Sequence, residues 1–274
     1  MLLKGLLIVY LTKQILKKPI YFFINKMCQS LKSVVEIWKK EGLKSIIKRS
    51  VTYLKWIIGY PYCFLKVRKL KNLDEAFRFV FSKCDGLIQP AQVKSEIAQV
   101  LKILEKEKPK YIMEIGTGNG GNLLLFSRVA SDDAKIISLD LRGGEFGGGY
   151  AFWRIPLYKS FALKKQKIYL VNANSHKGIT LKKIKNILRD EKLDFLFIDG
   201  DHTYEGAKKD FEMYQSLVKE NGIIALHDIA KSDVKECKVD KFWEELKKKY
   251  KGLEIINDKN QGWGGVGVVR NKAP

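Results

Sequence analysis

Cysteine and histidine are scarce in this chain, with four cysteines and three histidines among 274 residues. The cysteines, at positions 28, 63, 84 and 237, are far apart and form no C-x-x-C pair. Their spacing fits neither a zinc site nor a disulfide framework. We therefore expect a protein of a reducing compartment, and the sequence favours the cytoplasm.

Long apolar runs are also missing. Lysines interrupt every apolar window of the first 72 residues, whereas a bilayer span needs about 20 consecutive apolar residues. No small-residue cleavage site follows the first apolar run, so a signal peptide is a poor fit. We expect no transmembrane helix.

Acidic residues are nearly absent from the beginning of the chain. Residues 1–72 hold sixteen Lys and Arg against two acidic residues, a balance of +14 within a total net charge of +21. A basic amphipathic extension of this kind can lie on an anionic membrane at its inner face. It can equally cap the main domain or a second subunit, so a homo-oligomer is compatible with the sequence. Nucleic acid is the weaker partner, because no binding motif accompanies the charge.

The composition changes near residue 72, and beyond it strands and helices alternate. We therefore predict a basic helical extension over 1–72 and one catalytic domain over 73–274. The alternation predicts an α/β, Rossmann-like, doubly wound fold with a mostly parallel seven-stranded sheet and a C-terminal antiparallel hairpin. The strands are predicted at 111–115, 135–140, 167–172, 194–199, 222–228, 253–257 and 266–270. Helices are predicted from Pro90 to about 107 and at about 123–129, 177–189, 203–219 and 238–250.

A glycine-rich turn follows the first predicted strand, in the string Glu114-Ile-Gly-Thr-Gly-Asn-Gly-Gly121. Such glycines let a nucleotide-type ligand approach the backbone and the N-terminus of the next helix. Asp140 ends the following strand, where a carboxylate can accept hydrogen bonds from two ribose hydroxyls. A second glycine-rich stretch, 143–150, is either a lid over this pocket or a surface loop.

A second polar string, Asp199-Gly-Asp-His202, follows the fourth predicted strand, and His227-Asp228 ends the fifth. If these strands are neighbours, their carboxylates lie side by side, and carboxylate oxygens suit hard divalent cations. An imidazole at His202 can act as a general base near neutral pH. The plainer interpretation is a turn with Thr203 capping the next helix.

These strings resemble those of class I S-adenosylmethionine-dependent methyltransferases. The longer string from Asp194 through Asp199-Gly-Asp-His202 to His227-Asp228 is similar to the branch that includes the cephalosporin-biosynthesis and macrolide-sugar O-methyltransferases. The likeness covers about residues 86–270. It implies an O-methyltransferase that acts on a sugar, a glycan-linked molecule or another small acceptor. Methyltransferases of amino groups on bases typically carry a D/N-P-P-Y/F string where this chain reads Asp199-Gly-Asp-His202.

The resemblance also assigns roles to residues. It places S-adenosylmethionine against Gln89, Glu114, Gly116, Thr117, Gly118, Asn122, Asp140, Asn174 and Ser175. It places Mg²⁺ or another divalent cation on Asp199, His227 and Asp228, and it gives catalysis to Asp199 and to His202 as general base. Two positions depart from the family pattern, which often has aspartate at Asn174 and an acid or amide at His227.

Two other functions remain open at this point. The spacing from Gly116 to Gly121 also suits a nicotinamide-dependent oxidoreductase or a sugar-modifying enzyme on the same sheet, although no Tyr-x-x-x-Lys pair suited to hydride transfer is present. The basic extension is also compatible with a scaffold that binds a membrane or nucleic acid. Binding of NADH and deletion of residues 1–70 would discriminate among them.

Overall fold

The computed structural model describes residues 42–44, 47, 51, 59–82, 86–143, 149–151 and 154–272. The chain divides into two compact units, residues 1–58 and 59–274. The predicted membrane contact of residues 1–72 falls mostly outside the described residues, as does most of the glycine-rich stretch 143–150. Within the described residues, no helix is long and apolar enough to cross a bilayer.

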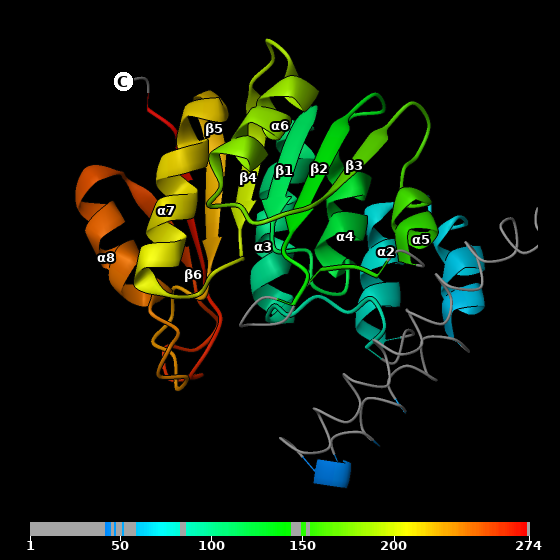
Figure 1. Ribbon diagram of the computed structural model, residues 1–274, viewed down its shortest axis with the longest axis horizontal. Coiled ribbons are helices and arrows are strands. Elements are labelled where there is room, and N and C mark those ends of the chain that lie inside the picture. The colour runs from blue at the N-terminus through cyan, green and yellow to red at the C-terminus, as the bar shows by residue number, and fades with distance from the viewer. Residues whose placement is uncertain are drawn as a thin grey trace, which may run out of the picture. The chain divides into compact units, whose positions relative to one another are not determined.

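A seven-stranded sheet forms the centre of the larger unit, in the order β3-β2-β1-β4-β5-β7-β6 (Figure 1). The first five strands are parallel, and β7 is antiparallel to both β5 and β6. This confirms the predicted mostly parallel sheet with an antiparallel C-terminal end. The strands are β1 (Tyr111–Ile115), β2 (Lys135–Asp140), β3 (Lys167–Asn172), β4 (Leu193–Ile198), β5 (Val218–His227), β6 (Gly252–Ile255) and β7 (Val266–Arg270).

Helices cover both faces of this sheet, as alternating strands and helices require. On one face, α6, α7 and α8 contribute buried side chains to the main apolar core. On the other face, Phe126 of α4 packs edge-on against Phe195 and Phe197 of β4, with ring centroids 5.2 and 5.4 Å apart. The helices are α2 (Leu73–Ser82), α3 (Lys94–Glu107), α4 (Gly121–Val129), α5 (Ile155–Lys159), α6 (Gly178–Leu188), α7 (Tyr204–Tyr214) and α8 (Val239–Lys249).

Three predicted boundaries were wrong by four or five residues. The helix expected from Pro90 begins at Lys94 instead, because residues 88–90 run against the start of α4. A Cβ on Gly121 would lie 2.4 Å from the backbone nitrogen of Pro90. The helix expected to reach residue 219 ends at Tyr214, and a 3-10 turn leads into β5, which begins four residues earlier than predicted. Val218 pairs with Leu193 of β4, so it belongs to the sheet.

Arg128 on α4 connects the helical residues 59–67 and the turn after them to the sheet domain. Its guanidinium donates to the carbonyl oxygens of Val67, Leu70 and Phe161. Burial lowers the pKa of Arg128 to about 10. Hydrogen bonds to a charged group contribute about 1.5–3 kcal/mol each, so this contact holds residues 67–70 against α4.

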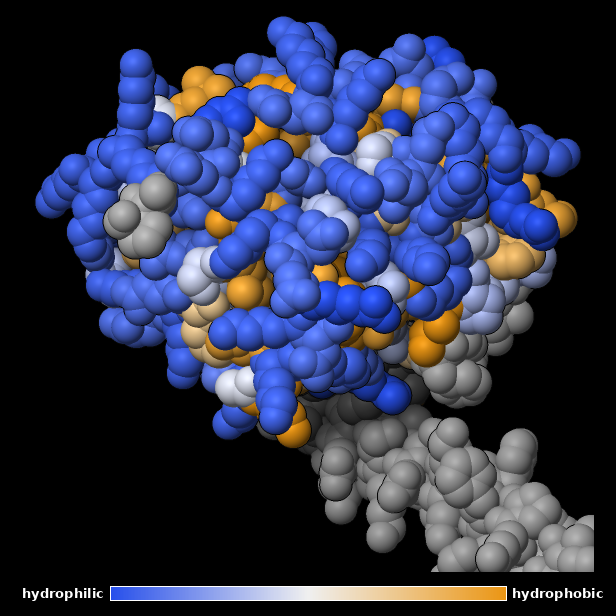
Figure 2. Space-filling model, turned by 90° about the horizontal axis from the view of Figure 1, so that it is seen from above, coloured by the Kyte–Doolittle hydropathy of each residue, from blue (hydrophilic) through white to orange (hydrophobic). Residues whose placement is uncertain are grey.

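The face of the molecule in Figure 2 is largely hydrophilic, and the hydrophobic residues visible on it lie in small separated groups. Scattered apolar groups of this kind are ordinary on a folded domain.

Candidate functional site

The glycine turn (residues 116–120) follows β1 and begins at a position where only glycine fits. Gly116 has φ +91, and a Cβ there would lie 1.8 Å from the carbonyl oxygen of Asp199. The backbone is pinned on both sides, because Gly116 N–H donates to Leu139 at 2.9 Å and Asp199 N–H donates to Ile115 at 2.8 Å. The end of β1 thus fixes the distance between the glycine turn and the residues after β4.

Asp140, at the end of β2, holds the glycine turn from the other side. One oxygen of its carboxylate accepts the N–H groups of Thr117 at 3.0 Å and Gly118 at 3.1 Å. Burial raises the pKa of Asp140 even though these backbone N–H groups oppose the rise. Asp140 is therefore a structural anchor of the turn as well as a wall residue of the cavity beside it.

Glu114 lies beneath the glycine turn and is not among the residues that line the cavity. Its side chain is completely buried, and neither carboxylate oxygen has a hydrogen-bond partner of normal geometry. Burial raises the pKa of Glu114 to about 8. The alternation of a strand explains its position, because Met113 and Ile115 point into the core on the face opposite to Glu114.

A cavity of about 870 Å³ opens between the glycine turn and the carboxyl ends of β4 and β5. Open α/β sheets bind their ligands at this edge, where the strand order reverses. The cavity is lined by every predicted site residue except Glu114, namely Gln89, Gly116, Thr117, Gly118, Asn122, Asp140, Asn174, Ser175, Asp199, His202, His227 and Asp228.

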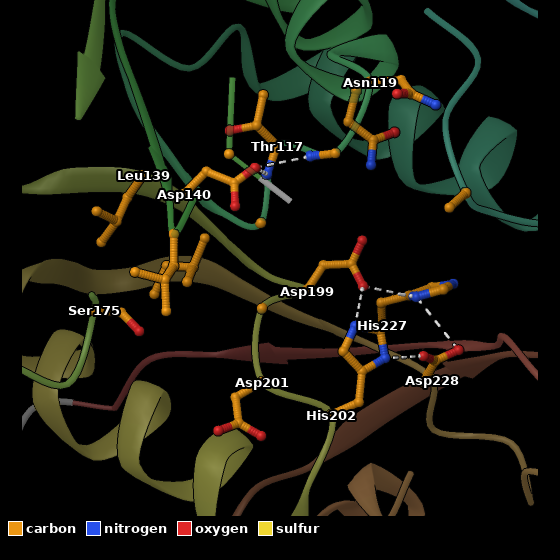
Figure 3. Close-up of a pocket in the computed structure, with 18 of the residues that line it drawn as sticks. Thr117, Asn119, Leu139, Asp140, Ser175, Asp199, Asp201, His202, His227 and Asp228 are labelled. Carbon is orange, nitrogen blue, oxygen red and sulfur yellow. Dashed lines mark hydrogen bonds and ion pairs between the residues drawn. The ribbon is translucent and has the colours of Figure 1, made fainter. Parts of the chain in front are cut away.

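Four of these side chains form a compact group, the carboxylate–imidazole cluster (Asp199, His202, His227 and Asp228; Figure 3). Asp199 Oδ1 lies 2.9 Å from His227 Nδ1 and 3.7 Å from His202 Nε2. Asp228 contacts the same two rings, with Oδ2 2.5 Å from His202 Nδ1 and Oδ1 3.4 Å from His227 Nδ1. The strands β4 and β5 are parallel neighbours, which is why the two carboxylates meet.

The backbone at Asp228 is in the left-handed region, with φ +60. Gly264 N–H donates to Asp228 Oδ1 at 2.9 Å and helps to hold this conformation. Burial opposes the charge on Asp228, but hydrogen bonding to His202 and the charges of both imidazoles outweigh it and lower its pKa to about 2. A strained, ionised carboxylate of this kind is frequent at functional sites.

Both imidazoles of the cluster are protonated more readily than free histidine. Burial lowers the pKa of His202, but Asp228, Cys237 and Asp199 outweigh it and raise the pKa to about 11. For His227 burial also acts downwards, and the charge of Asp199 gives a net rise in pKa.

The helix-cap interpretation of this turn is also confirmed, because Thr203 caps the next helix as predicted. Thr203 Oγ1 accepts the N–H of Gly206 at 3.0 Å and so caps α7. Asp201 accepts both the N–H and the hydroxyl of Thr203, and its carboxylate points away from the carboxylate–imidazole cluster (Figure 3). In this turn Asp201 and Thr203 therefore stabilise the start of α7, and His202 between them lines the cavity.

Gln92 is a site residue that the sequence did not reveal. Its Nε2 donates to Asp199 Oδ2 at 2.6 Å, and its Oε1 accepts from Asn122 Nδ2 at 2.6 Å. It thereby connects the start of α4 to the carboxylate–imidazole cluster. Gln92 lies in an irregular segment before α3, and no motif or periodicity marks it.

The loop after β3 forms another wall of the cavity and is held in place from α7. Asn174 Oδ1 accepts the N–H of His176 at 2.7 Å, and Tyr214 donates its hydroxyl to the carbonyl of Ser175 at 2.8 Å. His176 Nε2 lies 3.2 Å from the carboxylate of Asp210, which is completely buried. This ion pair and the two hydrogen bonds fix the loop.

The His176–Asp210 ion pair predicts a pH-dependent contribution to stability. Contact with Asp210 raises the pKa of His176, so its stabilising effect is complete below the unfolded pKa of about 6.5 and is lost as pH rises through the folded value. We expect His176→Gln to lower the free energy of unfolding by about 2 kcal/mol below pH 6.5 and by less at higher pH. Urea unfolding of both proteins at several pH values measures this difference. A difference that stays constant with pH would contradict it.

Comparisons with known proteins agree with this arrangement. Residues 113–229, which include the glycine turn and the whole carboxylate–imidazole cluster, match a family described as a methyltransferase domain. A comparison with curated proteins finds no match.

Several solved structures of low sequence identity match this chain. The cofactor-bound Rv0187 from MTB is 15% identical, with TM-score 0.52, covering 73% of this chain and 90% of its own. The O-methyltransferase TomG from Streptomyces achromogenes, in complex with SAM, is 13% identical, with TM-score 0.50 and coverage of 73% and 89%. An O-methyltransferase from Bacillus cereus in complex with SAH is 16% identical, with TM-score 0.49 and coverage of 72% and 90%.

Proposed function

We propose that this chain is an S-adenosylmethionine-dependent methyltransferase and that it methylates a hydroxyl oxygen of a small acceptor with the help of a divalent cation. The observation that carries the proposal is the carboxylate–imidazole cluster in the same cavity as the glycine turn. The fold shared with TomG, described as an O-methyltransferase, supports oxygen as the methylated atom.

The described residues fit S-adenosylmethionine at the glycine-turn end of the cavity. The volume of about 870 Å³ lies within the usual range for such ligands. Asn122 donates to Gln92, and its buried Oδ1 has no hydrogen-bond partner, so the free atom is an acceptor suited to the ammonium of the methionine end. Asp140 would bind the ribose, and Asn174 and Ser175 would lie against the adenine.

The carboxylate–imidazole cluster fits a divalent cation. Asp199, His227 and Asp228 each offer one ligand atom, and these atoms lie within 4.8 Å of one another. A cation bound there supplies a Lewis acid that lowers the pKa of an acceptor alcohol. Gln92 holds Asp199 in place through its second carboxylate oxygen, which leaves Oδ1 directed at the two imidazoles.

His202 is the candidate base for the acceptor proton. Its ring lies between Asp199 and Asp228 and lines the cavity. It accepts a proton only when the ring is neutral. A cation bound by Asp199 and Asp228 would favour the neutral ring, because its positive charge would offset the negative charge of these carboxylates beside His202. A site of this kind would hold the methyl donor, the acceptor hydroxyl and the base in one geometry, which is the main requirement for an in-line methyl transfer.

The acceptor is proposed to be a sugar or glycan-linked hydroxyl, an assignment that follows from the resemblance of the two strings. Trp263, which is 45% exposed, lies in the cavity wall together with Val234 and offers an aromatic surface to a ring. The competing oxidoreductase function has no support from the family match, which is to methyltransferase domains.

Calorimetry and turnover test the proposal. S-adenosylmethionine is expected to bind the purified full chain at micromolar to millimolar concentration, whereas NADH is not. Formation of S-adenosylhomocysteine with a panel of sugar acceptors should fall about 100-fold after EDTA treatment and recover on adding a divalent cation, with S-adenosylmethionine binding unchanged. Absence of binding at millimolar S-adenosylmethionine would refute the methyltransferase proposal, and turnover that is insensitive to EDTA would refute the metal.

A further inference from the structure

We propose that the cation site includes the thiol of Cys237 and selects an ion that prefers nitrogen and sulfur ligands, of the Zn²⁺ or Co²⁺ class, over Mg²⁺. This inference rests on the proposed function for the existence of a cation site. It adds a ligand that neither the motifs nor the resemblance assign, and it changes the class of ion.

Two overlapping groups of ligand atoms carry the inference. The first is Asp199, His227 and Asp228, and the second is His202, Asp228 and Cys237, each with its ligand atoms within 4.8 Å of one another. Asp228 belongs to both. Asp199, His227, Asp228 and Cys237 offer one imidazole nitrogen, one sulfur and two carboxylates at the carboxyl ends of β4 and β5, and His202 contacts Asp228 beside them as the candidate base.

The position of Cys237 is fixed by the backbone. Cys237 N–H donates to Val234 at 3.1 Å, and the next residue, Lys238, donates its N–H to the carbonyl of His202 at 2.8 Å. Cys237 is 5% exposed and lines the cavity together with His202. The loop after β5 is thus tied directly to the backbone of the residue whose ring Cys237 approaches.

The chemistry of these ligands decides the ion. Mg²⁺ requires oxygen ligands in octahedral geometry and keeps several waters, so an imidazole nitrogen and a sulfur are poorly suited to it. Thiolate and imidazole ligands favour Zn²⁺ and Co²⁺. These two ions bind more tightly than harder ions to sites of mixed nitrogen, oxygen and sulfur ligands. Ligand atoms about 2.0–2.1 Å from a tetrahedral ion lie about 3.3 Å from one another. His227 Nδ1 is 2.9 Å from Asp199 Oδ1 and 3.4 Å from Asp228 Oδ1, so these three ligands need little movement, and the Cys237 sulfur lies within 4.8 Å of its ligand atom on Asp228.

Cobalt absorption tests this directly, because a thiolate bound to Co²⁺ gives a charge-transfer band in the near ultraviolet. Metal-free full-length protein titrated with Co²⁺ should show this band. It should also show strong visible bands, which are typical of Co²⁺ with a low coordination number. Cys237→Ser should lose the ultraviolet band and bind Co²⁺ at least tenfold more weakly. Cys63→Ser is the matched control, because Cys63 is also a buried cysteine but does not line the cavity.

Several outcomes would overturn the inference. They are no Co²⁺ binding, Co²⁺ binding without the ultraviolet band, a band that persists in Cys237→Ser, and displacement of Co²⁺ by an equal concentration of Mg²⁺. If Cys237→Ser does not fold, the near-ultraviolet band is compared between the wild-type protein and Cys237→Ala, and its presence in the first and absence in the second are the expected result. Methyl transfer measured on the same samples separates the two proposals, since full activity of Cys237→Ser with Mg²⁺ would leave the methyltransferase intact and remove only this site.

Discussion

Asp199→Asn is expected to lower kcat for methyl transfer about 1,000-fold, while the affinity for S-adenosylhomocysteine changes by less than about threefold. The substitution keeps the shape of the side chain but removes the charge that faces His227 and His202. The proposed cation would lose a ligand and the candidate base would lose a partner, and contributions of this kind are worth 10²–10⁴-fold in rate. Stopped assays of S-adenosylhomocysteine formation, with calorimetry for binding, measure both quantities.

Asp201→Asn is the matched control for this experiment. Asp201 lies two residues from Asp199 on the same turn, but its carboxylate binds Thr203 at the start of α7. We expect less than about a threefold change in kcat, with a small loss of stability typical of a weakened helix start. Equal losses in the two variants would show that the turn matters only as structure.

Gly116→Ala is expected to lower the free energy of unfolding by about 3–5 kcal/mol and to abolish binding of S-adenosylmethionine. A Cβ there would collide with the carbonyl oxygen of Asp199 in addition to the cost of a positive φ. The strands β1 and β4 would have to separate, which would displace Asp199 as well. Urea unfolding and calorimetry measure the two effects.

Gly118→Ala separates the two causes, because Gly118 also has positive φ but a Cβ at that position would have no atom within 4 Å. Only the conformational cost of about 1–2 kcal/mol should remain. A similar loss in both variants would contradict the close approach of β1 and β4 that the structure shows.

The sequence was sufficient to predict the sheet and the meeting of the two polar strings. Strand-length apolar runs and the positions of Asp140, Asp199 and Asp228 at their ends predict a shared edge, because parallel strands end on the same side of a sheet. The order β2-β1-β4-β5 then brings these ends together. The family resemblance, and not the strand pattern, assigned His227 to this site, because alternation along a strand puts neighbouring side chains on opposite faces.

The remaining site residues were beyond sequence reasoning for physical reasons. Gln92 and Cys237 lie in irregular segments, where side-chain direction depends on contacts with distant parts of the chain. Glu114 lies on the opposite face of β1 from Met113 and Ile115, as strand alternation predicts, and its contact with the cofactor stays a prediction.

Arg128 has a consequence for any attempt to shorten the protein. A chain that starts at residue 73 would lose the carbonyl oxygens of Val67 and Leu70, leaving the largely buried guanidinium with fewer acceptors at a cost of about 2–3 kcal/mol. The smallest autonomous enzyme should therefore begin at Gly59, where the larger compact unit starts.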